Sequence, residues 1–129
     1  MVVSLTAGAV KFIFKIKVFS FTAKGMHMPS IHLIEKNEKY KIVDKDSDEW
    51  ESGFWAVSIE SASNLIHGNI YLHKGQKEPS FFGGVISGFR ITGATPNEKI
   101  TFRFRRMLSH EGVTTEKEGW GNEQKRVWS

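Results

Sequence analysis

The feature that most constrains the fold of this chain is an alternation of apolar and polar residues with a period of two. It is clearest over residues 99–106, where Ile100, Phe102 and Phe104 alternate with polar side chains. Such alternation is typical of a β-strand with one buried and one solvated face. Further short strands are expected at residues 30–34, 40–43, 54–57, 70–73 and 81–91, with a loop and a last short strand within residues 107–129.

Only one stretch has the period of an amphipathic helix. Ser58 is a suitable N-cap, Ile59, Ala62, Leu65 and Ile66 form an apolar stripe, and Gly68 is a suitable terminator. A doubly wound parallel sheet needs several crossover helices, so this pattern disfavours that class. It predicts an α+β fold, mainly antiparallel, in which a small sheet curls into a barrel beside one main helix.

Composition bounds the organisation and the chemistry. The 129 residues, 40% of them hydrophobic, suit one domain, and the absence of cysteine excludes a disulfide framework, a thiolate metal cluster and a cysteine nucleophile. The formal charge of +4 is unevenly spread, since residues 1–25 carry +4, residues 26–60 carry −4 and residues 61–129 carry +4. A uniform basic coat is therefore excluded, whereas a basic face on the C-terminal half would suit an anionic partner.

The first 27 residues permit two interpretations. Residues 11–18 alternate like a strand, which would lie at the edge of the sheet. Alternatively, translation starts at Met26 or Met28, and residues 1–27 are an extension outside a single domain of residues 28–129. Three lysines interrupt the apolar run, so a signal peptide or membrane span is disfavoured, and we expect a cytoplasmic protein without membrane association.

Two internal segments carry specific expectations. Residues 44–51 are rich in acids but lack the glycine and glutamate spacing of a calcium-binding EF-hand, so they predict a solvated acidic loop. Gly83 and Gly84 interrupt an apolar strand. Their presence indicates a bulge, a barrel corner, or the close approach of another backbone or a ligand.

A resemblance to a known superfamily comes from residues 55–86. Trp55-Ala56-Val57 precedes a helix ending in Leu65-Ile66-His67-Gly68, followed by the strand Asn69-Ile70-Tyr71-Leu72-His73 and by Ser80-Phe81-Phe82-Gly83-Gly84-Val85-Ile86. This order of motifs resembles the core of the PUA-like superfamily, in particular its ASCH and EVE branches. The resemblance implies a pseudo-barrel that binds RNA, or a modified base in DNA, in a cleft beside the helix.

The resemblance does not extend to the residues that catalysis in this superfamily uses. Some ASCH-like proteins are amidohydrolases that use a Lys-Thr-Glu constellation after the helix, but Asn69-Ile70-Tyr71 stands there in this chain. No nucleophile elbow or phosphate-cradling loop is recognisable, and His67, His73 and His110 lack the spacing of a zinc motif. The sequence therefore favours a binding protein without cofactor or metal over a hydrolase of modified nucleosides.

Candidate binding residues are cations for phosphate contacts, aromatic rings for base stacking and polar groups beside them. Each also has an ordinary structural interpretation, as part of a solvated loop, an outer strand face or, for Trp55, the core. The candidates are Trp50, Trp55, His73, Lys74, Lys77, Ser80, Phe82, Arg90, Arg103, Arg105 and Arg106.

The sequence thus predicts a nucleic-acid-binding module for RNA or modified-base DNA. In this hypothesis the loop at residues 74–80 and the arginine row of residues 103–106 capture phosphates beside an aromatic cleft. The alternative is a protein interaction module, such as a homodimer paired through the apolar N-terminal strand, with no nucleic-acid ligand.

Overall fold

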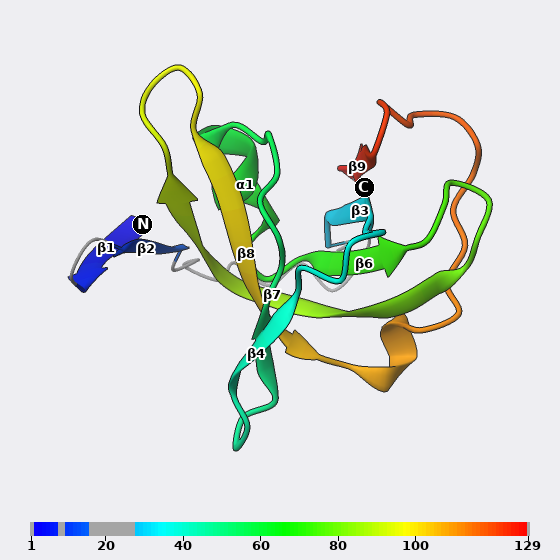
Figure 1. Ribbon diagram of the computed structural model, residues 1–129, viewed down its shortest axis with the longest axis horizontal. Coiled ribbons are helices and arrows are strands. Elements are labelled where there is room, and N and C mark those ends of the chain that lie inside the picture. Colours follow the sequence, from blue (N-terminus) through cyan, green and yellow to red (C-terminus); the bar gives the residue numbers. More distant parts are fainter. Residues whose placement is uncertain (1, 8–9, 16–27, 129) are drawn as a thin grey trace, which may run out of the picture.

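The computed structural model describes residues 2–7, 10–15 and 28–128 (Figure 1). The helices in this part are α1 (Ile59–Leu65) and the short 3-10 helix η1 (Leu108–His110). The strands are β1 (Val2–Ala7), β2 (Val10–Lys15), β3 (Ser30–Ile34), β4 (Lys41–Asp44), β5 (Glu49–Glu51), β6 (Asn69–His73), β7 (Ser80–Thr92), β8 (Lys99–Arg106) and β9 (Gln124–Val127).

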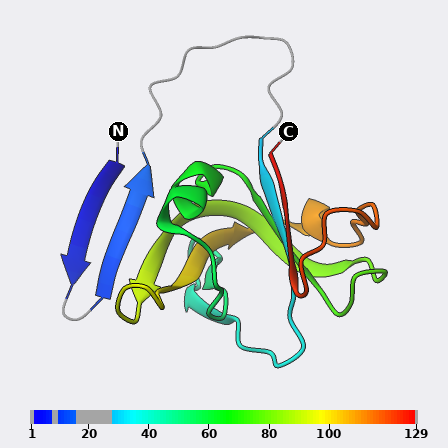
Figure 2. The ribbon, with the colours of Figure 1, turned by 90° about the horizontal axis from the view of Figure 1, so that it is seen from above.

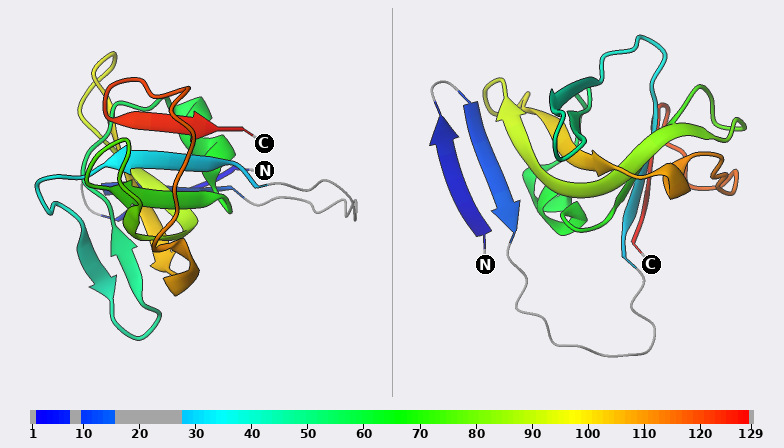
Figure 3. Two further views of the ribbon diagram at one scale, coloured as in Figure 1. Left: turned by 90° about the vertical axis from the view of Figure 1, so that its right-hand side faces the viewer. Right: turned by 90° about the horizontal axis from the view of Figure 1, so that it is seen from below.

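All of these strands belong to one mixed sheet. Seven strands follow the order β4-β5-β8-β7-β6-β3-β9, while β2 pairs with β7 and β1 pairs with β2. The β3–β6 pair is parallel and the other pairs are antiparallel, so the predicted α+β, mainly antiparallel class is confirmed. The left panel of Figure 3 shows β9, β3 and β6 side by side.

The long strand β7 gives the sheet its curvature. Its first half pairs with β6, its end pairs with β2, and β8 follows it from Gly84 to Thr92 (Figure 1). The two ends of the seven-strand path, β4 and β9, do not pair with each other in the described part of the chain. The sheet is therefore curled but open, and closure into a barrel is not observed.

Two glycines in β7 permit the close approach of neighbouring backbones, which is one of the three sequence interpretations. A Cβ atom on Gly83 would overlap the backbone oxygen of Ile70, and one on Gly84 would overlap that of Arg105. Neighbouring backbones on both sides of β7 therefore approach too closely for any side chain.

The helix and the core agree with the predicted periodicity. The Ser58 hydroxyl accepts a hydrogen bond from the Ser61 N–H at 3.1 Å, as an N-cap should. Ile100, Phe102 and Phe104 are fully buried and belong to the same core as Leu65 of the helix. Figure 2 shows α1 beside the β1–β2 hairpin at one end of the sheet, with β3 and β9 at the other.

The N-terminal residues provide part of the predicted strand. Residues 10–15 form β2, which pairs with β7 in the register of Lys11 with Ile91 and Ile13 with Phe89. The remainder of the predicted strand, residues 16–18, lies outside the described residues. None of the helices in the described ranges is long and apolar enough to cross a membrane.

Two other segments differ from the secondary structure that the sequence predicted. Residues 44–51 are not a loop throughout, because they include the end of β4 and all of β5. The predicted strand at residues 54–57 is an extended segment with one bridge, in which the Trp55 N–H donates to the Ile100 oxygen at 2.9 Å. Phe54 in this segment is 54% exposed, so the segment is only partly buried.

Candidate binding cleft

The predicted arginine row is largely neutralised by the acidic stretch. Arg90 Nε lies 2.8 Å from Glu51 Oε2, Arg103 Nε lies 3.2 Å from Glu49 Oε1, and Arg106 Nε lies 2.9 Å from Asp48 Oδ2; Arg105 is exposed. Burial raises the pKa of Glu49, but hydrogen bonds from Arg103, Ser87 and Ser47 outweigh it and leave that pKa below its usual value. Asp48, Glu49 and Glu51 are therefore ion-pair partners of β7 and β8, whereas Asp46 lies in an exposed turn as the sequence predicted.

In the predicted basic loop at residues 74–80, the two lysines are exposed as expected, but Ser80 lies outside the loop. Lys74 and Lys77 are exposed, and Lys74 Nζ lies 4.3 Å from the centre of the Phe81 ring. Ser80 is not a loop residue, since it is buried as the first residue of β7. Its hydroxyl donates to the His110 oxygen and accepts from the Val113 N–H at 2.9 Å. Ser80 therefore anchors the segment after β8 rather than facing a ligand.

The aromatic candidates separate into two places. Trp50 and Phe82 meet at the side of the sheet where β5 lies, with ring centres 4.8 Å apart, and both contact Tyr40. Trp50 Nε1 also donates to Asp48 Oδ1 at 2.8 Å. Trp55 is not part of this cluster, so the three aromatic rings do not form one stacking surface.

His73 is buried in a hydrogen-bonded pair. Its Nδ1 lies 2.8 Å from the Glu78 carbonyl oxygen, which can only accept, so Nδ1 carries the proton. Its Nε2, 2.8 Å from His32 Nδ1, then accepts from that nitrogen. Burial is the main cause that lowers the pKa of both rings, that of His32 to about 4, with His73 and Lys125 contributing to the His32 shift.

The histidines weighed as zinc ligands do not come together. His110 stacks on Tyr71 with ring centres 4.9 Å apart, and its Nε2 lies 2.8 Å from Asn69 Oδ1, whereas His67 is exposed beyond the end of α1. Within residues 28–128 and the two N-terminal strands, no three His, Asp or Glu side chains are grouped as metal ligands.

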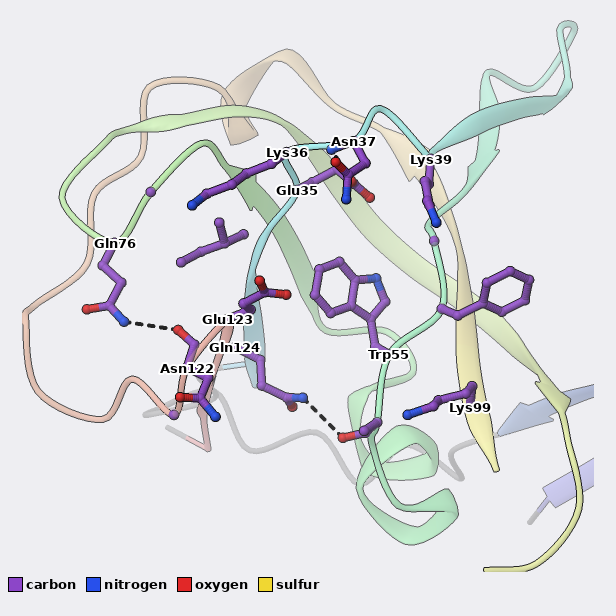
Figure 4. Close-up of a pocket in the computed structure, with 16 residues that line it drawn as sticks. Glu35, Lys36, Asn37, Lys39, Trp55, Gln76, Lys99, Asn122, Glu123 and Gln124 are labelled. Atoms are coloured by element: carbon purple, nitrogen blue, oxygen red, sulfur yellow. Dashed lines mark hydrogen bonds between the residues drawn. The ribbon is translucent and has the colours of Figure 1, made fainter. Parts of the chain in front are cut away.

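A cleft of about 1000 Å³ opens at the gap between the two ends of the curled sheet (Figure 4). Its walls are the segment after β3, the extended segment before α1, the loop after β6 and the start of β9. The lining residues are Ile34, Glu35, Lys36, Asn37, Lys39, Gly53, Phe54, Trp55, Ala56, Gly75, Gln76, Lys99, Gly121, Asn122, Glu123 and Gln124.

Two of the residues that line this cleft each carry a buried polar atom without a hydrogen-bond partner among the described residues. Trp55 is 9% exposed, and its Nε1–H has no hydrogen-bond partner in the described part of the chain. The same holds for Gln124 Oε1, although Gln124 Nε2 donates to the Ala56 oxygen at 3.1 Å. Buried polar groups are nearly always hydrogen-bonded, and an unpaired one costs free energy. Both atoms are buried in the cleft wall, so a ligand pairs them only when the side chains that cover them move aside.

A buried acid and a glycine complete the cleft. Glu35 is 4% exposed, and its Oε2 accepts from the Asn37 N–H at 3.1 Å. A Cβ atom on Gly53 would stand 3.2 Å from Glu35 Oε1 and 4.0 Å from Trp55 Nε1. Glycine is therefore favoured where this segment packs closely against Glu35 and Lys39, and Figure 4 shows Trp55 between Glu35 and Gln124.

Trp55, which the sequence offered as a candidate or as a core residue, belongs to the core and also lines the cleft. Its neighbours in the cleft were not predicted. Phe54 is exposed at the rim, and Lys36, Lys39 and Lys99 are exposed around it. An acid at residue 35, directly after the strand of residues 31–34, was the one local signal, because a strand end can hold a buried carboxylate. Comparison of this chain with protein-family models, with curated proteins and with solved structures gives no match, so function is argued from the cleft itself.

Proposed function

We propose that this protein is a PUA-like nucleic-acid-binding module that takes an unpaired base of RNA, or a modified base of DNA, into the Trp55 cleft in the cytoplasm. The observation that carries the proposal is the unpaired Trp55 Nε1–H and Gln124 Oε1 at one cleft. The edge of a base offers both donors and acceptors, so it has a suitable group for each of these atoms once they are uncovered.

The shape of the sheet supports the PUA-like part of the proposal. The hydrogen bond from Gln124 Nε2 to the Ala56 oxygen links the start of β9 to the segment before α1. This contact spans the gap left by the open sheet, so a pseudo-barrel would be completed by a side chain rather than by a strand pair. Ala56 lies two residues before the N-cap Ser58, so the cleft lies beside the helix, where the resemblance puts the ligand.

Exposed lysines, more than the arginine row, supply the phosphate contacts in this proposal. Lys36, Lys39 and Lys99 line the cleft, and Lys74 and Lys77 flank its wall at Gly75 and Gln76. Arg90, Arg103 and Arg106 would first have to leave their carboxylates. The exposed ring of Phe54 at the rim offers a face on which a neighbouring base can stack.

Fluorescence titration tests the proposal, because Trp55 reports on the cleft. Single-stranded RNA, single-stranded DNA and duplex DNA are compared at two salt concentrations, with Trp55→Phe to assign the signal. We expect saturable quenching by single strands that weakens with salt. Quenching by none of them would contradict the proposal and make a protein partner the leading hypothesis.

A charge-matched pair of variants locates the site. Replacing Lys36, Lys39 and Lys99 by alanine should reduce the slope of log affinity against log salt by about 2, at about 0.7 per phosphate contact on a single strand. The control replaces Lys41, Lys45 and Lys117, which are exposed but do not line the cleft. Equal losses in both variants would mean that the lysines act through net charge and that the cleft is not the site.

A further inference from the structure

We infer that a single strand bound at the Trp55 cleft continues past the start of β9 into a second groove, where Arg126 and Trp128 bind its next nucleotides. This inference rests on the proposed function and adds a second contact region to it. The groove has a volume of about 580 Å³, and its lining residues are Gly119, Gly121, Asn122, Gln124, Arg126 and Trp128. Three of these, Gly121, Asn122 and Gln124, also line the cleft, so the groove and the cleft adjoin at the turn before β9.

The alternation of side chains along an extended chain places the groove on one face of β9. Gln124, Arg126 and Trp128 follow one another at intervals of two residues, and all three line the groove. Lys125 lies on the opposite face, where it is buried and its Nζ donates to the Glu116 oxygen at 2.7 Å. From Gln124 to Trp128 the chain spans about 13 Å at the usual rise of a strand. The far end of the groove is therefore out of reach of a ligand confined to the cleft.

The groove offers the two kinds of group that bind a single strand whatever its sequence. Arg126 is exposed and is the one charged residue among the described residues that line the groove. Its Nη1 donates to the neutral Ser61 hydroxyl at 3.3 Å, and no ion pair of the described residues includes it, so its charge is not neutralised like those of the paired arginines of β7 and β8. Trp128 is 47% exposed. A guanidinium pairs with phosphate, and an indole ring stacks on any base.

The groove is accessible as it stands. All of its lining residues except Gln124 are exposed, so no side chain has to move before a ligand can reach Arg126 or Trp128. Strand β9 ends the seven-strand path and pairs only with β3 among the described residues, and Figure 3 shows it at that edge of the sheet. Glu118 and Glu123, the acids next to lining residues in the sequence, do not line the groove and so do not face a phosphate there.

The test compares two lengths of single-stranded RNA on the full chain by isothermal titration calorimetry. A uridine dinucleotide can occupy the cleft alone, whereas a uridine hexanucleotide can also reach the groove. We expect Trp128→Ala to weaken binding of the hexanucleotide at least about fivefold, the lower end for the stacking of one base on an aromatic ring, and to leave the dinucleotide unaffected. Trp128→Phe keeps a ring for stacking and should retain most of the affinity for the hexanucleotide.

A second variant tests the phosphate contact. Arg126→Ala should reduce the slope of log affinity against log salt by about 0.7 for the hexanucleotide, the value for one phosphate contact on a single strand, and by nothing for the dinucleotide. The control Arg105→Ala removes an exposed arginine that lines neither the cleft nor the groove. Equal slopes for these two variants, or a Trp128→Ala protein that binds the hexanucleotide like the wild type or loses affinity for both lengths alike, would overturn the second groove and leave the proposed function intact. Binding of neither RNA to the wild type would overturn both.

Discussion

At the residue scale, the buried His32–His73 pair determines how stability depends on pH. The pKa of His32 is about 4 in the folded chain, against 6.5 for the free side chain, because the ring is buried beside His73 and Lys125. The unfolded chain therefore binds more protons between these pH values. The free energy of unfolding should fall as the pH decreases from 6.5 to 4, by about 3 kcal/mol from His32 at the lower end. Urea denaturation at a series of pH values measures this loss.

A non-titrating variant isolates the contribution of His32. Asparagine in His32→Asn retains an N–H near the position of Nδ1, so the bond to His73 Nε2 can persist while titration is removed. Most of the pH dependence should then disappear, with a remainder from His73 and His110, whose pKa values burial also lowers. His67→Asn, at an exposed position, is the control and should keep the dependence of the wild type. Identical profiles for the two variants would contradict the assignment.

At the scale of elements, local patterns were predictable and partners were not. The N-cap Ser58 and the buried residues Ile100, Phe102 and Phe104 of β8 depend on neighbours in sequence, and both were predicted from the sequence. Thr101, expected on the solvated face of β8, is buried as well. The charges on residues 44–51 and 103–106 were noticed separately, because periodicity tells which face a side chain occupies but not which strand lies beside it. The pairing of β5 with β8 joins segments more than fifty residues apart and turns two apparent surface features into one network.

The buried ion pair and the exposed ion pair of this network should contribute differently to the free energy of unfolding. Arg90→Ala removes the cation that faces Glu51, whose side chain is 7% exposed, and should reduce the free energy of unfolding by about 3 kcal/mol. Arg106→Ala removes the partner of the more exposed Asp48 and should have a much smaller effect. Urea denaturation of both variants compares them. A similar loss for each would mean that burial does not govern these pairs.

At the scale of the whole molecule, the cleft is a consequence of an open sheet. Glu35, Gly53 and Gln124 come from three separate segments and meet only because β7 curls and the two ends of the sheet face each other. No local pattern in the sequence specifies that curvature. Gly83 and Gly84 indicated a bulge, a barrel corner or a close approach, and the sequence left the choice among them open. The sequence could therefore identify Trp55 as a candidate aromatic residue but could not predict which polar groups surround it.

The N-terminal hairpin gives the last prediction. Strand β2 covers the edge of β7 at Phe89 to Ile91 and also contacts α1, so a chain that begins at Met28 would leave this edge unpaired. Its melting temperature should be several degrees lower, since about 1 kcal/mol shifts a domain of this size by a few degrees. Oligonucleotide affinity below that temperature should not change, because β2 does not line the cleft. An unchanged melting temperature would instead support the interpretation of residues 1–27 as an extension. Light scattering on both chains tests the homodimer hypothesis, which expects the full chain to be a dimer and the shortened chain to be a monomer.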